Sequence, residues 1–201
     1  MRYISQQQGI TAINDRVCKT YTFSWENHYC KVPDLQQRLE QVCPEEALRF
    51  DFKTFLSRLS KIIFDPFLVI SFHHRNRTPE FHDKTFASKI PNQILERDIV
   101  NNGQSILDKI KIAADDYMQS PLAQQVDLQA ETDYLENLGI TQDNVYLHFR
   151  GHNIYNLVCH IGDCIVPKSV SFENEILNHH LPNAGYWEYD KVLQDIDDAT
   201  K

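Results

Sequence analysis

The sequence has few glycines and no long run of apolar residues. Its 201 residues include only six glycines, and none of them forms the glycine-rich loop that cradles phosphates in nucleotide-binding proteins. A membrane-spanning helix needs roughly 20 consecutive apolar residues, but the best stretch, 62–72, is much shorter and contains Asp65 and Pro66. The first residues also lack the apolar core of a signal peptide. These absences favour a cytoplasmic protein that does not enter a membrane.

Cysteine is scarce too, and its spacing suits neither disulfides nor zinc. The five cysteines are an odd number without tight pairs: Cys18, Cys30, Cys43, Cys159 and Cys164. Such a set argues against a disulfide framework. Structural zinc sites need short paired spacings, which Cys159 and Cys164 do not form with His179 and His180. We expect the cysteines to fill small apolar gaps in the core.

Positive charge is in deficit, because 20 Lys and Arg face 28 Asp and Glu, for a net charge of −8. A general polyanion binder is therefore not expected. The positive charge is unevenly placed, however: residues 73–89 hold Arg75, Arg77, Lys84 and Lys89 with three histidines. This segment has no sustained period and is predicted to be an exposed loop. We expect this segment to contact nucleic acid or the acidic face of a partner. The alternative is that it is a solvated loop.

The balance of 42% apolar and 24% charged residues is that of a folded protein, and no repeat or linker divides the chain. We predict one domain over residues 1–201. Rings at positions 21, 23 and 25 alternate with hydroxyl groups, which predicts a strand over about 17–25, and positions 145, 147 and 149 predict a second. The predicted fold class is α/β, mostly helical, with a small incomplete sheet and a helical insertion.

Helices are predicted wherever apolar residues recur at helical spacing next to a capping residue. One begins at Pro33, and one follows Asp51 until Asp65-Pro66 breaks or kinks it. The others are expected from about Ser105, over 125–138 with Gly139 as the end, from a cap at Asn153 to Gly162, and from near Ser171.

Polar side chains follow both predicted strands. They are Glu26-Asn27-His28 and Arg150-Gly151-His152-Asn153. Since ligands bind beyond the carboxyl ends of strands in open α/β sheets, we expect Glu26 and His152 to meet at one rim. Glu26 would hold a divalent metal or act as a general base, and His152 beside Arg150 would bind an anion. The alternatives are an exposed carboxylate at a helix start, and turn residues followed by a helix cap.

The stretches Thr22-Phe23-Ser24-Trp25-Glu26-Asn27 and Gly151-His152-Asn153 resemble a bacterial domain-of-unknown-function family. That family is related to the Toprim domain of overcoming-lysogenisation-defect (OLD) nucleases. The resemblance covers the chain from about residue 17. It implies a Toprim-like sheet and a Mg²⁺-dependent nuclease of phage defence, often encoded with an ABC-type ATPase, with some members acting on RNA.

The resemblance also implies roles for particular residues. Glu26 and His152 would be catalytic, and Glu26 would bind Mg²⁺. In such a nuclease we expect the basic residues Arg75, Arg77, Lys84 and Arg150 to contact nucleic acid, on the ground of their charge and not of a family motif. Asn153 departs from the acid that the family carries there. The family's glutamate and Asp-x-Asp acids lie upstream of the glu-asn motif, and only sixteen loosely patterned residues precede the strand here. The resemblance is therefore to a carboxyl-terminal portion, without the acids that two-metal chemistry needs.

A second hypothesis comes from a different class of protein. An incomplete sheet exposes an unpaired edge, which can pair with another chain. The chain would then be a non-catalytic module that docks on an ABC-type ATPase or a sister subunit, including a copy of itself, through this edge and the 73–89 segment. The negative net charge favours this hypothesis, whereas the two polar motifs favour the nuclease.

Overall fold

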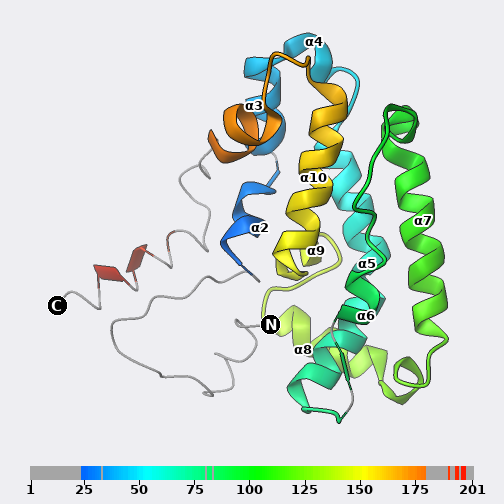
Figure 1. Ribbon diagram of the computed structural model, residues 1–201. Coiled ribbons are helices and arrows are strands. Elements are labelled where there is room, and N and C mark those ends of the chain that lie inside the picture. Colours follow the sequence, from blue (N-terminus) through cyan, green and yellow to red (C-terminus); the bar gives the residue numbers. More distant parts are fainter. Residues whose placement is uncertain are drawn as a thin grey trace.

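The computed structural model describes residues 24–32, 34–79, 81–82 and 84–179, together with 190, 193–194 and 196–197. Within these ranges all regular elements are helices, and no residue lies in a strand (Figure 1). The predicted α/β fold is therefore wrong for the described part of the chain, which is all-α. The Toprim-like sheet and its exposed edge are not present there.

The second predicted strand is a helix, α9 (Val145–His148). In the turn before α9, Asn144 Oδ1 accepts the N–H of Thr141 at 2.7 Å. Such a bond from a side chain to the backbone favours a turn over an extended strand. Residues 145–149 are all buried. Alternation in sequence indicates a strand only when one face is exposed, so here it carried no information about the backbone.

The first predicted strand lies outside the described residues up to position 23. Its last residue, Trp25, begins a helix instead, α2 (Trp25–Tyr29). Asn27 Oδ1 accepts both the N–H of Ser24, at 2.9 Å, and its hydroxyl, at 3.1 Å. This exchange between the residue before the helix and its third residue is a variant of the capping box, and it starts the helix at this point.

The longest helix is α5 (Phe52–Arg75), with 24 residues. Asp51 is its N-cap as predicted, because its Oδ1 accepts the N–H of Thr54 at 3.0 Å. The predicted break at Pro66 is wrong, since the helix continues through it. Proline removes one hydrogen bond, but the apolar residues on both sides of it are buried, and their burial outweighs that loss.

One long helix packs along α5, and another packs against α2, α9 and η3 (Phe172–Ile176) (Figure 1). α7 (Val100–Met118) starts at the same end as α5, and α10 (Gly151–Ile165) runs in the opposite direction. Their apolar residues share one core with those of the shorter helices. Among the described residues, no helix combines the length and the apolar composition that crossing a membrane requires.

The beginnings of α5 and α7 are tied together by Asn102. Residues 101–103 have positive φ, at 52°, 54° and 73°. A Cβ at Gly103 would lie 2.8 Å from the ring of Phe55, so only glycine suits this close approach. The Asn102 amide compensates for the strained backbone, because it accepts the N–H of Asp51 at 2.7 Å and donates to its C=O at 3.0 Å.

The remaining elements are short and cover the ends of the long helices. They are α3 (Asp34–Val42), α4 (Pro44–Ala47), α6 (Lys84–Ala87), η1 (Glu96–Asp98), η2 (Ala123–Gln125), α8 (Leu128–Asn137), the π-helix η3 (Phe172–Ile176) and η4 (Leu177–His179). The helices predicted after Pro33, over 125–138 and near Ser171 are thus confirmed. Asn153 and Gly162 are not the ends of a helix, because both lie inside α10.

The 73–89 segment is not one exposed loop. Its first three residues end α5 and residues 84–87 form α6. His73 is buried, with Nδ1 at 2.9 Å from Thr78 Oγ1 and Nε2 at 2.9 Å from the C=O of Leu122. The prediction of an exposed loop is therefore wrong at both ends of the segment. The residues there are helical, although they lack the apolar periodicity of a helix.

A buried carboxylate holds α8 against α5. Glu131 is 2% exposed. It accepts the hydroxyl of Ser71 at 2.8 Å and pairs with Arg75, whose guanidinium also lies 4.0 Å from the ring centre of Tyr134. Arg75 thus has its charge neutralised inside the molecule.

Glu131→Ala should lower the free energy of unfolding by roughly 2–4 kcal/mol, because it leaves the Arg75 guanidinium without its buried partner. The matched control is Glu136→Ala on the exposed face of the same helix, which should change stability by less than about 0.5 kcal/mol. Urea unfolding followed by circular dichroism measures both. Equal effects of the two substitutions would contradict the assigned role of Glu131.

Candidate functional site

The two polar motifs meet through the side chain of Asn27. This residue is fully buried, and its amide donates to the C=O of Tyr146 at 3.2 Å and to that of Phe149 at 3.0 Å. Its oxygen meanwhile holds Ser24. A single amide therefore caps α2 and pins it to the α9–α10 junction, some 120 residues further along the chain.

Gly151 allows this close approach. A Cβ at position 151 would lie well inside contact distance of Ser24 Oγ and 2.5 Å from Asn27 Oδ1. The glycine is therefore needed for the packing of α10 against α2, and a tight turn is not the reason for it. The turn-and-cap alternative for Gly151-His152-Asn153 does not describe this structure, because Gly151 begins α10.

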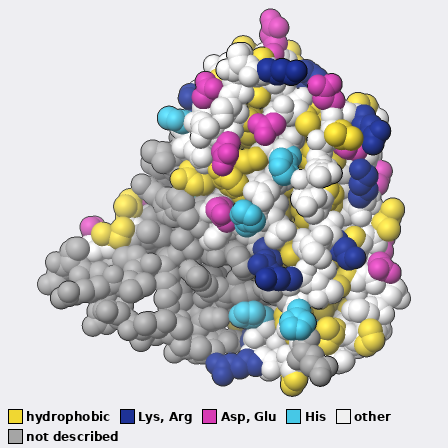
Figure 2. All heavy atoms as spheres, in the orientation of Figure 1, with side chains coloured by type: hydrophobic (Ala, Val, Ile, Leu, Met, Phe, Trp, Pro, Cys, Tyr) yellow, Lys and Arg dark blue, Asp and Glu magenta, His cyan; other side chains and the backbone are white. Residues whose placement is uncertain are grey.

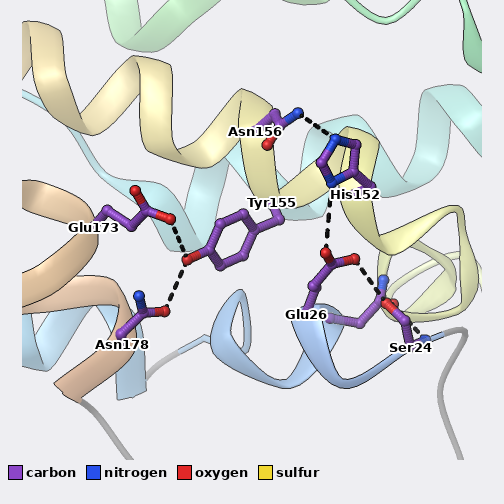
Figure 3. A network of polar contacts seen from close by, with 8 residues as sticks. Ser24, Glu26, His152, Tyr155, Asn156, Glu173 and Asn178 are labelled. Atoms are coloured by element: carbon purple, nitrogen blue, oxygen red, sulfur yellow. Dashed lines mark hydrogen bonds and ion pairs between the residues drawn. The ribbon is translucent and has the colours of Figure 1, made fainter.

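This packing places Glu26 beside His152 on the surface (Figure 3). Glu26 Oε1 lies 3.5 Å from His152 Nδ1, with the two side chains 41% and 74% exposed. The other carboxylate oxygen accepts the Ser24 hydroxyl at 3.2 Å. On the far side of the ring, the Asn156 amide nitrogen is 3.1 Å from Nε2. The expectation that an acid and an imidazole meet is confirmed, and their catalytic role stays a prediction.

The geometry defines what this group of side chains can do. Ser24 bonds to the carboxylate and not to the imidazole, so the three residues do not form a nucleophilic triad, in which the base must reach the hydroxyl. The carboxylate orients the ring, and an exposed histidine can take up or release a proton near neutral pH. The arrangement suits proton transfer to or from a bound molecule or water.

The same group of residues does not fit the magnesium chemistry that the resemblance implies. Mg²⁺ prefers oxygen ligands, and Glu26 is the one carboxylate in this cluster. Across the described residues, no three His, Cys, Asp or Glu side chains come together as metal ligands. The binding of Mg²⁺ by Glu26 stays a prediction.

Basic residues from two parts of the chain lie next to the start of α10. Asn153 donates to the C=O of Ala87 at 3.2 Å, and the rings of Phe86 and Phe149 meet edge to face with centroids 5.8 Å apart. Both contacts hold α6 against the start of α10. The exposed Lys84 and Lys89 therefore flank the α10 start, where Arg150 precedes the helix.

Figure 2 shows Lys, Arg and His side chains over α6 and the adjoining end of α5. Arg77 is exposed just after α5, with a left-handed φ of 50°. Of the four arginines and lysines predicted to contact nucleic acid, Arg77, Lys84 and Arg150 keep that prediction. The guanidinium of Arg75 pairs with Glu131 and lies over the ring of Tyr134, and its contact with nucleic acid also stays a prediction.

Two buried histidines lie behind the surface pair, and sequence patterns did not identify them as core residues. His28 and His148 are 2% and 4% exposed. Burial lowers the pKa of His28 to about 4, with Lys31 adding to the effect, and burial lowers the pKa of His148 to about 3. Both rings are therefore neutral at physiological pH.

Sequence reasoning also missed Tyr155, on the same face of α10 as His152. Its hydroxyl lies 2.9 Å from Glu173 Oε1 and 2.8 Å from Asn178 Oδ1 (Figure 3), and burial raises its pKa. It joins α10 to η3 and η4. The available signal was the i, i+3, i+4 spacing of His152, Tyr155 and Asn156 on one polar face of a helix.

Comparisons with protein-family models, with curated proteins and with solved structures found no match. The site is therefore interpreted from its own geometry.

Stability should fall as the pH drops from 6.5 toward 4. The pKa values of His28 and His148 are lowered in the folded chain, so the unfolded chain binds protons first. Each histidine contributes up to about 1.4 kcal/mol per pH unit in this window, and its contribution to stability is fully present above pH 6.5. Urea unfolding between pH 7.5 and 4.5 measures the slope. A flat profile across this window would contradict the assignment.

Gly151→Ala should cost roughly 1–3 kcal/mol, because the new methyl group overlaps Ser24 Oγ and presses on Asn27. Ser24→Ala in the same chain removes the nearest of these atoms and should recover part of the loss. A double-mutant cycle of unfolding free energies measures this coupling. If the two substitutions were simply additive, the close approach of α2 and α10 would not be the cause.

Proposed function

We propose that this chain is a helical, nucleic-acid-binding part of a phage-defence nuclease of the kind that its two motifs resemble. The observation that carries the proposal is the packing of α6 against the start of α10, which brings basic residues from distant parts of the sequence to the end of α10 that also holds the Glu26–His152 pair. Nuclease activity is not assigned to this chain alone, because one carboxylate cannot hold two metal ions.

The charge of this surface is local. The net charge of the chain is −8. Lys84, Lys89 and Arg150 nevertheless lie around the contact between α6 and the start of α10. Arg77 lies between the end of α5 and α6 in the sequence. Lysine and arginine bind phosphate groups without reading the bases. A surface of this kind supports binding of a nucleic-acid backbone with little sequence preference and strong dependence on salt.

The Glu26–His152 pair and Arg150 belong to the same end of α10, because Arg150 precedes the helix and His152 lies in its first turn. A phosphate bound by the basic side chains would bring its ester oxygens and its water close to the exposed imidazole. His152 can then exchange a proton with that water or oxygen while Glu26 holds the ring. The pair would assist chemistry whose metal-binding acids come from elsewhere.

The docking hypothesis relied in part on a sheet edge, and the described residues contain no sheet. It therefore retains only the 73–89 segment, which includes the same lysines as the proposed nucleic-acid surface. An acidic protein surface and a nucleic acid would compete for these side chains. The net charge of the chain does not distinguish them, because the charge that matters is the local one.

The test is titration of fluorescent single-stranded RNA and DNA 20-mers, followed by anisotropy at several salt concentrations. We expect Lys84→Gln, Lys89→Gln and Arg150→Gln combined to weaken binding at least tenfold. The slope of log K against log salt should fall by about 2, at roughly 0.7 per phosphate contact for single strands.

The matched control removes two lysines and one arginine at exposed positions near the beginnings of α5 and α7 and after α10: Lys53→Gln, Arg97→Gln and Lys168→Gln. It has the same net charge as the first variant and should bind almost as the parent does. Equal losses in the two triple variants would overturn the assigned surface. Failure of the parent to bind at 50 mM salt would overturn the proposed function and leave the acidic protein partner.

A further inference from the structure

We infer that Asn156 is a positioning residue for His152, and that its amide, together with the Glu26 carboxylate, selects the tautomer of this imidazole. The inference deepens the proposed function, because it concerns the proton-transfer group of that same site. It rests on the geometry of the ring and its two neighbours.

Both ring nitrogens of His152 have a partner, from opposite sides (Figure 3). Nδ1 is 3.5 Å from the Glu26 carboxylate, and Nε2 is 3.1 Å from the amide nitrogen of Asn156, one turn further along α10. A carboxylate only accepts hydrogen bonds, so the proton of the neutral ring belongs on Nδ1. Nε2 then has its lone pair free to accept from the Asn156 amide.

This arrangement selects the Nδ1–H tautomer, which is the minor form of a histidine side chain in water. The partner of one ring nitrogen determines where the proton of the other lies. Here the two partners act in the same sense, because Glu26 requires a donor at Nδ1 and the Asn156 NH₂ group requires an acceptor at Nε2.

Leucine has a similar size to asparagine but offers Nε2 no hydrogen bond. Around the ring, Glu26 is the carboxylate in contact. The next acid on this face, Glu173, is bonded to the Tyr155 hydroxyl. Asn156 and Glu26 therefore determine together which nitrogen of the neutral ring carries the proton.

The test is a long-range ¹H–¹⁵N spectrum of the histidine rings in the full chain, labelled with ¹⁵N-histidine and recorded at pH 8 without nucleic acid. The His152 signals are assigned by their loss in His152→Gln. We expect the parent to be mainly the Nδ1–H tautomer. Asn156→Leu should bring this tautomer below half, and Asn156→Gln, which keeps an amide, should restore it at least in part.

Asn137→Leu, the same substitution at an exposed position of α8, is the matched control and should leave the His152 tautomer as in the parent. Unchanged His28 and His148 signals in Asn156→Leu show that the core is intact. A parent ring that is mainly Nε2–H, or an Asn156→Leu ring that stays mainly Nδ1–H, would overturn the inference. The measurement needs no ligand, so failure of nucleic-acid binding is a separate result.

Discussion

The buried amide of Asn27 is the contact on which the site depends. It is fully enclosed, and it satisfies two carbonyl groups at the α9–α10 junction while its oxygen caps α2. Removing it would leave buried acceptors without partners, which is more costly than the loss of an ordinary hydrogen bond. Because Glu26 precedes Asn27 and His152 follows Gly151, the same amide sets the distance between the carboxylate and the imidazole.

Histidines lie both in the interior and on the surface beside this contact. His28 and His148 are kept neutral by burial, which lowers their pKa to about 4 and about 3. His152 is exposed and has a carboxylate on one nitrogen and an amide on the other. Their different burial follows from helix packing, since α2 contributes both His28 to the interior and Glu26 to the surface. The exposed imidazole of His152 therefore lies close to two buried histidines that are neutral at physiological pH.

Much of the helical structure could be predicted, because its signals are local. Asp51 caps α5, Gly139 takes a φ of 78° just beyond α8, and the apolar stripes of α3 and α10 face the core as expected. The strand predicted from positions 145, 147 and 149 is wrong because α9 is buried on all sides, so its alternating pattern did not mark an exposed face. Pro66 failed as a helix break because the tertiary packing of its neighbours outweighed one missing hydrogen bond.

By itself, the sequence determined where helices can start and which side chains must leave water, since capping and apolar periodicity act over a few residues. It also predicted that Glu26 and His152 lie close together, although the sheet rim expected to join them is absent from the described residues. Only the tertiary structure decided that Asn27 joins the two motifs, that Arg75 is neutralised by Glu131, and that Asn156 lies on the ring of His152. Most of these contacts link residues far apart in the chain, and all depend on how the helices pack and on rotamers that no local pattern encodes.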